Sequence, residues 1–315
     1  MMNKIREWIE TYQDIMIYRH VNPDPDAVGS AYGVYCFLKA NYPDKNIRLA
    51  GTLPQSLKDL FFQGAKVNTD VMLEDDRKLA IVVDTANKER VDGDLSVCEK
   101  IIKIDHHPPA DAFGDLNYVD DTASSCAQIL VTALCPENDG VEIPETAMRA
   151  LYLGMIADSN RFLYSQTDGR TFRAAARLCD LGLKLEPLYQ DFYVESRSHL
   201  DVKIDILNRY VYEDGVAYYY LKDEDLKRLG ISRAEGSNYV DELANIAEFK
   251  IYAALTENVE EHTIRVSLRS RDYAVNTVAV QFSGGGHRLA SGCTLESEEE
   301  IPLLLDKLKE LIKHG

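Results

Sequence analysis

Short runs of continuous apolar residues alternate with longer amphipathic segments in the first half of the chain. The apolar runs predict strands, and the segments with helical spacing of apolar residues predict helices. We expect strands at residues 14–19, 46–50, 79–83 and 100–104, and helices at 26–40, 122–134, 144–157 and 168–181. Apolar strands that alternate with helices are typical of a parallel sheet covered on both faces. The pattern therefore predicts an α/β domain with a parallel sheet over residues 1–195.

A different pattern follows in the second half of the chain. Residues 185–209 contain no Gly or Pro after Pro187, which predicts a wholly helical segment. Beyond it, strands alternate irregularly with helices. We expect strands at 216–221, 249–256, 263–270 and 293–295, and helices near 236–246, 275–282 and 298–313. The sequence thus predicts a helical connector at 196–210 and a smaller mixed α/β domain at 211–315.

The composition is that of a soluble globular protein, with 45% hydrophobic and 28% charged residues among 315. No apolar run approaches the length of a membrane span, and the first ten residues carry charges where a signal peptide needs an apolar core. The six cysteines form no CxxC pair, so we expect reduced thiols without a zinc site. These features predict a cytoplasmic protein with no membrane partner.

The net charge of −17 limits the nucleic acids that the chain could bind. A protein this acidic repels long polyanions and gains little from the counterion release that drives general nucleic-acid binding. We therefore expect no long duplex substrate. Any nucleic-acid substrate should be short, or should bind to a local basic patch.

A cluster of polar residues follows the first predicted strand, in the order His20-Val-Asn-Pro-Asp24-Pro-Asp26. The two prolines keep this turn extended and remove backbone donors, so that the three side chains can point into a common space. Taken alone, Asp24 or Asp26 could equally be the N-cap of the following helix.

Two further strands end in the same kinds of residue. Asp84 directly follows the third strand, and Asp105, His106 and His107 directly follow the fourth. In an open α/β sheet the carboxyl ends of parallel strands face the ligand crevice. A lone Asp after a strand is usually a turn residue, but three strands that all deliver Asp or His to one edge predict a functional site.

A fourth candidate is Asp158, where an apolar helix runs into small polar residues. Carboxylate and imidazole ligands without cysteine favour Mn²⁺, Mg²⁺ or Fe²⁺ over a structural zinc site. The set is too large for one ion and suits two ions that share a bridging carboxylate. Its members are His20, Asp24, Asp26, Asp84, His106 and Asp158.

The order HxxxDxD, then Asp, then Asp-His-His, then a late Asp resembles the DHH phosphoesterase superfamily. The resemblance implies that Asp84 bridges two divalent ions, with Mn²⁺ expected and Mg²⁺ left open. It implies that Asp105 orients an imidazole and that His107 faces the substrate phosphate. One ion would be bound by His20, Asp24 and Asp84, and the other by Asp26, Asp84, His106 and Asp158.

The second domain carries a local charge of about +3 between residues 262 and 292, with four arginines and one acidic residue. Strand alternation places Arg265, Ser267, Arg269 and Arg271 on one face. The sequence GGGH that follows could be a flexible loop, or its backbone N–H groups could bind an oxyanion. Together, SLRSR and GGGHxxASG resemble the DHHA1 nucleic-acid-binding domain. The implied substrate-binding residues are Arg269, Arg271, Gly284, Gly285, Gly286 and His287.

Within the superfamily the chain most resembles the nanoRNase group, which degrades very short single-stranded RNAs and dephosphorylates nucleotide bisphosphates such as 3′-phosphoadenosine-5′-phosphate (pAp). A cyclic or linear dinucleotide phosphodiesterase and a non-catalytic nucleotide sensor are the alternatives, and a homodimer is left open. Related enzymes usually have Thr-Gly after the late Asp, whereas this chain has Ser159 and Asn160. That departure could alter substrate preference.

Overall fold

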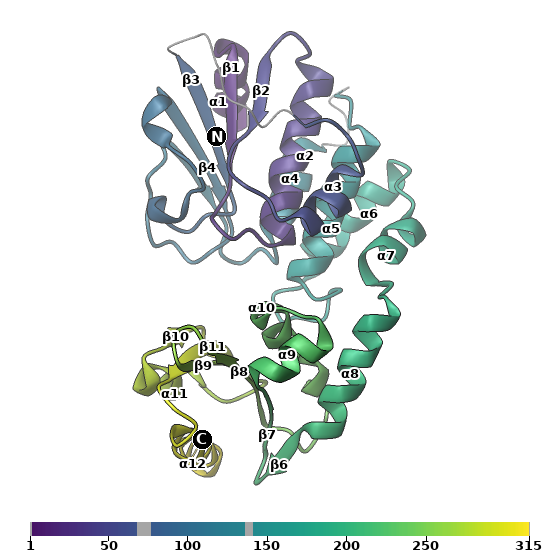
Figure 1. Ribbon diagram of the computed structural model, residues 1–315. Helices are drawn as coiled ribbons and strands as arrows, with labels where there is room; N and C mark the ends of the chain where they lie inside the picture. Colours follow the sequence, from purple (N-terminus) through teal and green to yellow (C-terminus); the bar gives the residue numbers. More distant parts are fainter. Residues whose placement is uncertain (1, 68–76, 136–140, 315) are drawn as a thin grey trace. The chain divides into compact units, whose positions relative to one another are not determined.

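The computed structural model describes residues 2–67, 77–135 and 141–314 (Figure 1). The chain divides into two compact units, Met1–Val194 and Glu195–Gly315. Among the residues that the structure describes, no helix is both long and apolar enough to span a bilayer.

The first unit is built on a five-stranded sheet in which all neighbouring strands pair in parallel. The strand order is β2-β1-β3-β4-β5. The central strands β1 and β3 are buried along nearly their whole length, which explains their continuous apolar sequences. The strands are β1 (Asp14–Tyr18), β2 (Asn46–Leu49), β3 (Lys78–Val83), β4 (Lys100–Asp105) and β5 (Leu116–Val119).

Helices cover one face of this sheet and form the larger core with it. The opposite face is covered by the connection between β3 and β4, where Val91 and Leu95 pack on Tyr18 and Val82. The predicted α/β class, with a parallel sheet covered on both faces, is confirmed. The helices are α1 (Met2–Thr11), α2 (Pro25–Asn41), α3 (Gln55–Phe62), α4 (Cys126–Leu134), α5 (Glu145–Asp158), α6 (Gly169–Asp180) and α7 (Leu185–Tyr193), with the short 3₁₀ turns η1 (Lys88–Arg90) and η2 (Leu95–Val97).

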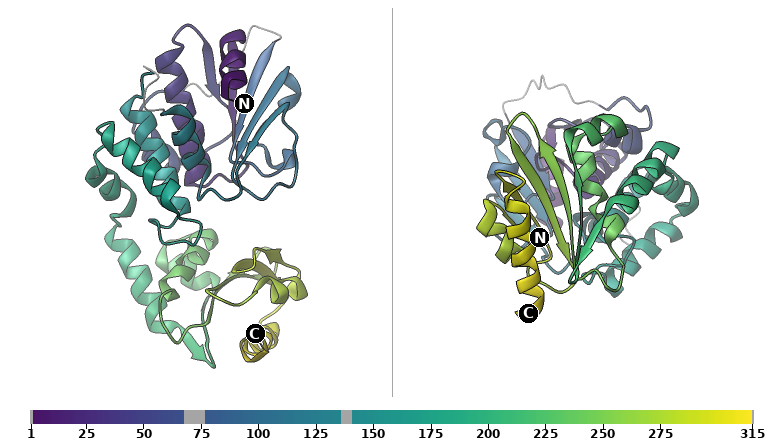
Figure 2. Two further views of the ribbon diagram at one scale, coloured as in Figure 1. Left: turned by 180° about the vertical axis from the view of Figure 1, so that it is seen from behind. Right: turned by 60° about the horizontal axis from the view of Figure 1, so that its bottom comes forward.

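The second unit contains a six-stranded mixed sheet in the order β10-β11-β9-β8-β7-β6. The right-hand view of Figure 2 shows strands of this sheet in green. Only β7 and β8 pair in parallel, and the other neighbours are antiparallel. This sheet confirms the predicted mixed α/β character of the second half. Its strands are β6 (Val211–Glu213), β7 (Val216–Leu221), β8 (Ile251–Asn258), β9 (Thr263–Ser270), β10 (Gly285–Gly286) and β11 (Ala290–Leu295).

Two separate cores flank the second sheet. One contains residues of α11 and α12, and the other contains residues of α8, α9 and η3. The helical elements of this unit are α8 (Arg197–Arg209), α9 (Asp223–Leu229), α10 (Arg233–Asn238), η3 (Tyr239–Leu243), α11 (Asn276–Ala279), η4 (Val280–Phe282) and α12 (Glu300–His314).

The predicted continuous helix at 185–209 is wrong. It is two helices, because α7 ends at Tyr193 and the Ser196 hydroxyl caps a new helix by accepting a hydrogen bond from the backbone N–H of His199. The second helix, α8, buries Val202 and Ile206 in a core of the second unit. The segment expected as a connector is therefore packed onto that unit.

The predicted helix at 236–246 begins earlier and is shorter than expected. A capping box between Ser232 and Glu235 starts α10 at Arg233, and the chain turns into the 3₁₀ segment η3 after Asn238. The sequence pattern also missed the short elements α3, β5 and α9, which have too few residues to show a clear period.

Candidate metal centre

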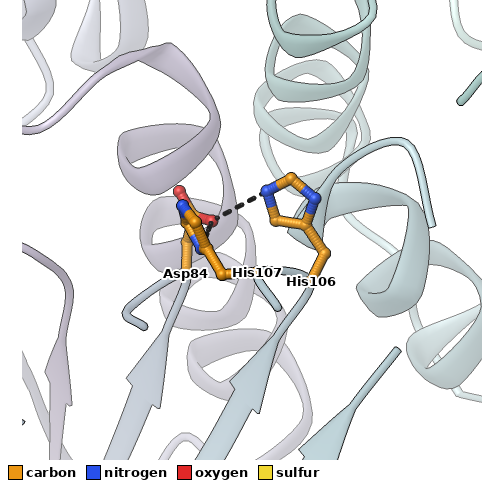
Figure 3. Close-up of side chains that lie close together, drawn as sticks. All are labelled: Asp84, His106 and His107. Atoms are coloured by element: carbon orange, nitrogen blue, oxygen red, sulfur yellow. Dashed lines mark ion pairs between the residues drawn. The ribbon is translucent and has the colours of Figure 1, made fainter. Parts of the chain in front are cut away.

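The carboxyl ends of β1, β3 and β4 bring Asp and His side chains to one edge of the first sheet. Asp84 follows β3 with a φ of 50°, a left-handed conformation that Asp adopts more readily than most residues. Its backbone N–H donates to the carbonyl of Ile104 on the neighbouring strand at 2.9 Å. This turn aims the Asp84 carboxylate toward His106 and His107, which follow β4 (Figure 3).

Among the described residues, three groups of three side chains have ligand atoms within 4.8 Å of one another: His20 with Asp24 and Asp84, Asp26 with His106 and Asp158, and Asp84 with His106 and His107. In the first group, the Nε2 atom of His20 lies 3.6 Å from Asp24 Oδ2 and 3.7 Å from Asp84 Oδ2. In the second group, the Nε2 atom of His106 lies 3.4 Å from Asp158 Oδ2 and 3.9 Å from Asp26 Oδ2. The structure thus brings together all six residues expected as ligands.

The carboxylate of Asp84 belongs to the His20 group and also faces His106 of the second group. Its Oδ2 atom faces His20, and its Oδ1 atom lies 3.3 Å from His106 Nε2. The Oδ1 atom is buried and has no hydrogen-bond partner among the described residues. Two ligand atoms that each lie about 2.1 Å from an ion are about 3.0–3.4 Å apart, close to the separations seen here. The arrangement therefore fits two divalent ions bridged by one carboxylate.

Asp26 is fixed by the beginning of α4. Its Oδ2 atom accepts a hydrogen bond from the N–H of Cys126 at 2.7 Å, and its Oδ1 atom accepts one from the N–H of Ala127 at 3.0 Å. A Cβ atom at Gly154 would lie 2.8 Å from Asp26 Oδ1, so the glycine leaves the space that this carboxylate needs. Neither contact could be predicted from local sequence patterns, because the partners lie about 100 residues away.

The electrostatics of the cluster are those of carboxylates crowded together without a cation. Burial, with Asp84 and Asp158 nearby, raises the pKa of Asp26 well above its usual value. Burial and the negative charge of Asp84 raise the pKa of Asp158 to about 6, although His106 opposes the shift. Burial alone would lower the pKa of His106, but the aspartates around it raise that pKa to about 10. A divalent cation would relieve this repulsion.

In the first group the pKa of the histidine is again raised, but the pKa of Asp24 is lowered. Burial alone would lower the pKa of His20, but its hydrogen bond to Asp24 and the charges of Asp24 and Asp84 raise it. Burial would raise the pKa of Asp24, whereas the hydrogen bonds from His20 and the N–H of Ala27 lower it. Asp24 is also the N-cap of α2, which confirms that interpretation of this residue from the sequence. Its side chain is 53% exposed, which leaves it open to solvent.

Asp105 is paired with His107. The Oδ1 atom of Asp105 lies 2.8 Å from His107 Nδ1 and also accepts the backbone N–H of His107. Burial would raise the pKa of Asp105, but these hydrogen bonds and the charge of Lys103 lower it. With Nδ1 engaged, the Nε2 atom of His107 is the ring nitrogen left to meet a substrate.

Lys103 supports this pair from within β4. Its side chain is 1% exposed, and its Nζ atom lies 3.2 Å from Asp105 Oδ2. It also donates to the carbonyl oxygens of Ala86 and Asp111. Lys103 was not among the predicted site residues, although a lysine inside an apolar strand two residues before Asp105 was a usable signal.

The turn after Asp158 contains the departure from the related enzymes. Asn160, Arg161 and Phe162 all have left-handed φ values, of 46°, 58° and 67°. The hydroxyl of Ser159 donates to the carbonyl of Met155 and accepts the N–H of Phe162. Asn tolerates the left-handed region better than most residues but less readily than Gly. Asn160 therefore fits a position at which glycine would be unstrained.

In the second unit, strand β9 alternates as expected. Val266 and Leu268 are buried, whereas Arg265 is exposed and Ser267 and Arg269 are half-buried on the other face. The polar face of the basic strand is therefore available to a ligand.

Arg271 lies beyond the end of β9 and is engaged by the protein itself. Its Nη2 atom donates to the carbonyl oxygens of Ile246, Ala247 and Phe249 at 3.0, 3.4 and 3.2 Å. Among the described residues, Arg269 donates a hydrogen bond to the carbonyl of Leu268. Desolvation raises the pKa of Asp241, and the charge of Arg269 opposes that shift. The contacts of Arg271 account for it without a substrate, so we keep Arg269 and not Arg271 in the substrate-binding set proposed below.

The glycine-rich segment is an edge strand and not an open loop. Gly285 and Gly286 form β10 and pair with Gly292 and Ser291 of β11. Because β10 is the outermost strand of the sheet, its other edge is free of a neighbouring strand.

Close backbone contacts require glycine in this segment. A Cβ atom at Gly284 would collide with the carbonyl of Gly292, and Gly286 has a φ of 134°. The N–H of His287 donates to the carbonyl of Ala290 at 2.9 Å, so this N–H is not available to an anion. An oxyanion would have to be bound by other groups of the segment.

A parallel sheet with this Asp and His set at its carboxyl edge defines the class of DHH-type metal-dependent hydrolases. Residues 14–155 match the DHH family, N-terminal domain, and residues 213–314 match the DHHA1 domain. The chain therefore belongs to the DHH family and has a DHHA1 domain as its second half.

Full-length relatives agree with this assignment. A Bacillus subtilis protein named bifunctional oligoribonuclease and PAP phosphatase NrnA is 33% identical over 99% of both chains. A Streptococcus mutans protein with the same name, marked probable, is 36% identical over 97% of both chains. Among solved structures, an exopolyphosphatase-related protein from Bacteroides fragilis has a TM-score of 0.86 and 25% identity, covering 99% of this chain and 97% of that one.

Proposed function

We propose that this protein is a metal-dependent phosphoesterase that hydrolyses short oligoribonucleotides to mononucleotides and removes the 3′-phosphate of pAp. The observation that carries the proposal is the Asp84 carboxylate, which belongs to the His20 group and also faces His106, in a geometry that fits two divalent ions. The names of the full-length relatives supply the substrate class.

Residues of the first unit would bind two ions. His20, Asp24 and Asp84 would bind one ion, and Asp26, His106 and Asp158, together with Asp84, would bind the other. When bound, the ions would lower the pKa of a water molecule and neutralise charge on the phosphate.

Two residues would act on the substrate directly or through a neighbour. His107 would donate a hydrogen bond from Nε2 to a phosphate oxygen, because its Nδ1 atom is engaged by Asp105. Asp105, in contact with Lys103, would hold that imidazole in one tautomer and orientation. In the second unit, Arg269 and the segment from Gly284 to His287 would bind the nucleotide.

The ligand types and the net charge of the chain also favour a particular ion and a particular kind of nucleic acid. Mn²⁺ is the ion we expect in a centre of carboxylate and imidazole ligands, with Mg²⁺ as the competitor. The net charge of −17 favours short single strands over long duplexes. We further propose a cytoplasmic location, where nucleotide bisphosphates and short RNA would be met, and we leave a homodimer open.

A side-by-side assay in Mn²⁺ tests this function. The substrates are pAp, linear and cyclic dinucleotides, a 5′-labelled RNA ladder from dimer to about 24-mer, and pyrophosphate. Fast turnover of pAp and of dimers to pentamers, fading with length, is the expected result.

The other outcomes separate the alternatives. Preference for a cyclic dinucleotide would favour a dinucleotide phosphodiesterase, and preference for pyrophosphate would move the chain to another substrate class with the same centre. Binding of nucleotides without turnover of any substrate would favour a non-catalytic sensor.

A further inference from the structure

A polar cavity of about 560 Å³ lies in the second unit, between α10 and the exposed face of β9. Hydroxyl and amide groups form much of its wall, including those of Ser237, Asn238, Asn258 and Ser267. The volume is within the range of cavities that bind small ligands. A wall of this composition suits a polar ligand.

Two arginines give the cavity its charge. Arg233 and Arg265 both line it, and among the described residues neither guanidinium has a hydrogen-bond or ion-pair partner. The one carboxylate in the wall is that of Glu261, which accepts a hydrogen bond from Asn258 Nδ2 at 2.6 Å. The cavity thus has a surplus of positive charge inside a protein of net charge −17.

Other arginines of the same unit do have partners. Arg209 and Arg228 both lie within 3.0 Å of Asp225, and Arg228 also contacts Asp205. In such an acidic chain counter-charges are plentiful, so two arginines that face one cavity without any are available to an anion from outside.

The cavity adjoins the glycine-rich strand. A Cβ atom at Gly292 would lie 3.6 Å from Arg265 Nη2, so the guanidinium extends over this glycine. Gly292 pairs with Ser267 on one side and with Gly285 of β10 on the other. Paired residues of antiparallel strands share a face of the sheet. Arg265 therefore lies on the face that also presents Gly285.

We propose that Arg233 and Arg265 form a subsite for an additional phosphodiester group of an oligoribonucleotide, next to the nucleotide site at Gly285. This subsite rests on the proposed function. It would contact a phosphate that trimers and longer strands have and that pAp lacks. It therefore contributes to affinity for oligomers of at least three nucleotides, without taking part in hydrolysis.

The test compares the double variant Arg233→Ala/Arg265→Ala with wild type on pAp and on RNA from dimer to pentamer. We expect KM for trimers to pentamers to rise about tenfold, because each arginine supplies charged hydrogen bonds, with kcat unchanged and KM for pAp within twofold. The slope of log KM against log salt for the pentamer should fall by about 0.7, the value expected for one phosphate contact on a single strand. Arg228→Ala, which removes the same charge outside the cavity, is the matched control.

Equilibrium binding separates this proposal from the function on which it rests. Fluorescence anisotropy with a labelled pentamer and the intact chain needs no turnover, and the double variant should bind about tenfold more weakly. If wild type binds RNA more tightly than the double variant but hydrolyses no substrate, the subsite is supported and the proposed function is contradicted. Equal pentamer binding by wild type and the double variant, an equal rise in KM for pAp, or the same effect from Arg228→Ala would overturn the subsite.

Discussion

The carboxylate of Asp26 accepts the backbone N–H of Cys126 at 2.7 Å, although the two residues lie 100 positions apart in the chain. The contact places a candidate metal ligand at the start of α4, where backbone N–H groups and the helix dipole stabilise negative charge. The geometry of the metal centre therefore depends on how α2, α4 and α5 pack, as well as on the strand ends.

Gly154→Ala should damage the centre through Asp26. The new Cβ would lie 2.8 Å from Asp26 Oδ1 and 3.0 Å from Ala127 Cβ. Neither the hydrogen-bonded carboxylate of Asp26 nor the helix α4 can easily move. We expect kcat/KM for pAp to fall about 10–100-fold, with weaker metal binding by calorimetry. Gly169→Ala, where the nearest atoms belong to a flexible arginine, is the control and should leave both unchanged.

Asp84→Ala should abolish turnover without unfolding the protein. The substitution removes the one carboxylate that faces both ligand groups, so we expect a loss of about 10³-fold or more in kcat. In the metal-free protein it also removes a negative charge from a crowded cluster, which offsets the strain of alanine at a φ of 50°, so the protein should stay folded. Full activity of this variant would contradict the two-ion centre.

Asp105→Asn should lower kcat and leave the metal content unchanged. The amide cannot hold the His107 imidazole as the carboxylate does, and Lys103 would lose the charge that it faces. We expect a loss of about 10–100-fold in kcat. Metal analysis of the purified variant separates this from loss of an ion, and a proportional loss of metal would show that Asp105 acts on the ligands instead.

The two arginines near the end of β9 should respond differently to alanine. Arg269→Ala should raise KM for pAp about tenfold and leave Tm within about 1 °C, because its guanidinium has one carbonyl contact. Arg271→Ala should lower Tm by about 2–4 °C, because three carbonyl oxygens lose their donor. Thermal melts and steady-state kinetics on both variants check this, and reversed effects would return Arg271 to the substrate site.

The stability of the metal-free protein should depend on pH through Asp158 and His106. Both have raised pKa values, about 6 and about 10, so the folded chain binds protons that the unfolded chain releases. The free energy of unfolding should therefore fall as pH rises, from about 4 to 6 for Asp158 and from about 6.5 to 10 for His106.

Divalent ions need these groups deprotonated, so the increase in Tm on adding Mn²⁺ should grow with pH. Between pH 6 and 8.5 we expect the increase to grow by at least about 3 °C. Melts of EDTA-treated protein, with and without Mn²⁺ at each pH, measure the difference directly. An increase that is the same at every pH would contradict the assignment of these ligands.

The class of the first sheet and most candidate site residues could be predicted from the amino-acid sequence alone. Continuous apolar strands fixed the central strands of the parallel sheet, and Asp84 and His106 stand out because each follows such a strand. The alternation of polar and apolar residues also predicted that the odd-numbered residues of β9 share one face of the strand. These features depend on residues that are close together in the chain, and local periodicity reports them.

The packing of helices and strands determines which of these side chains lie together. It also determines which of them are hydrogen-bonded to other parts of the protein. The contact of Asp26 with Cys126 joins residues of different helices. The hydrogen bonds of Arg271 to three backbone carbonyls likewise join segments that lie apart in the chain. No local period encodes such contacts, because they arise only when helices and strands pack and buried polar groups must find partners. Whether a charged residue serves a ligand or the fold is settled at that stage.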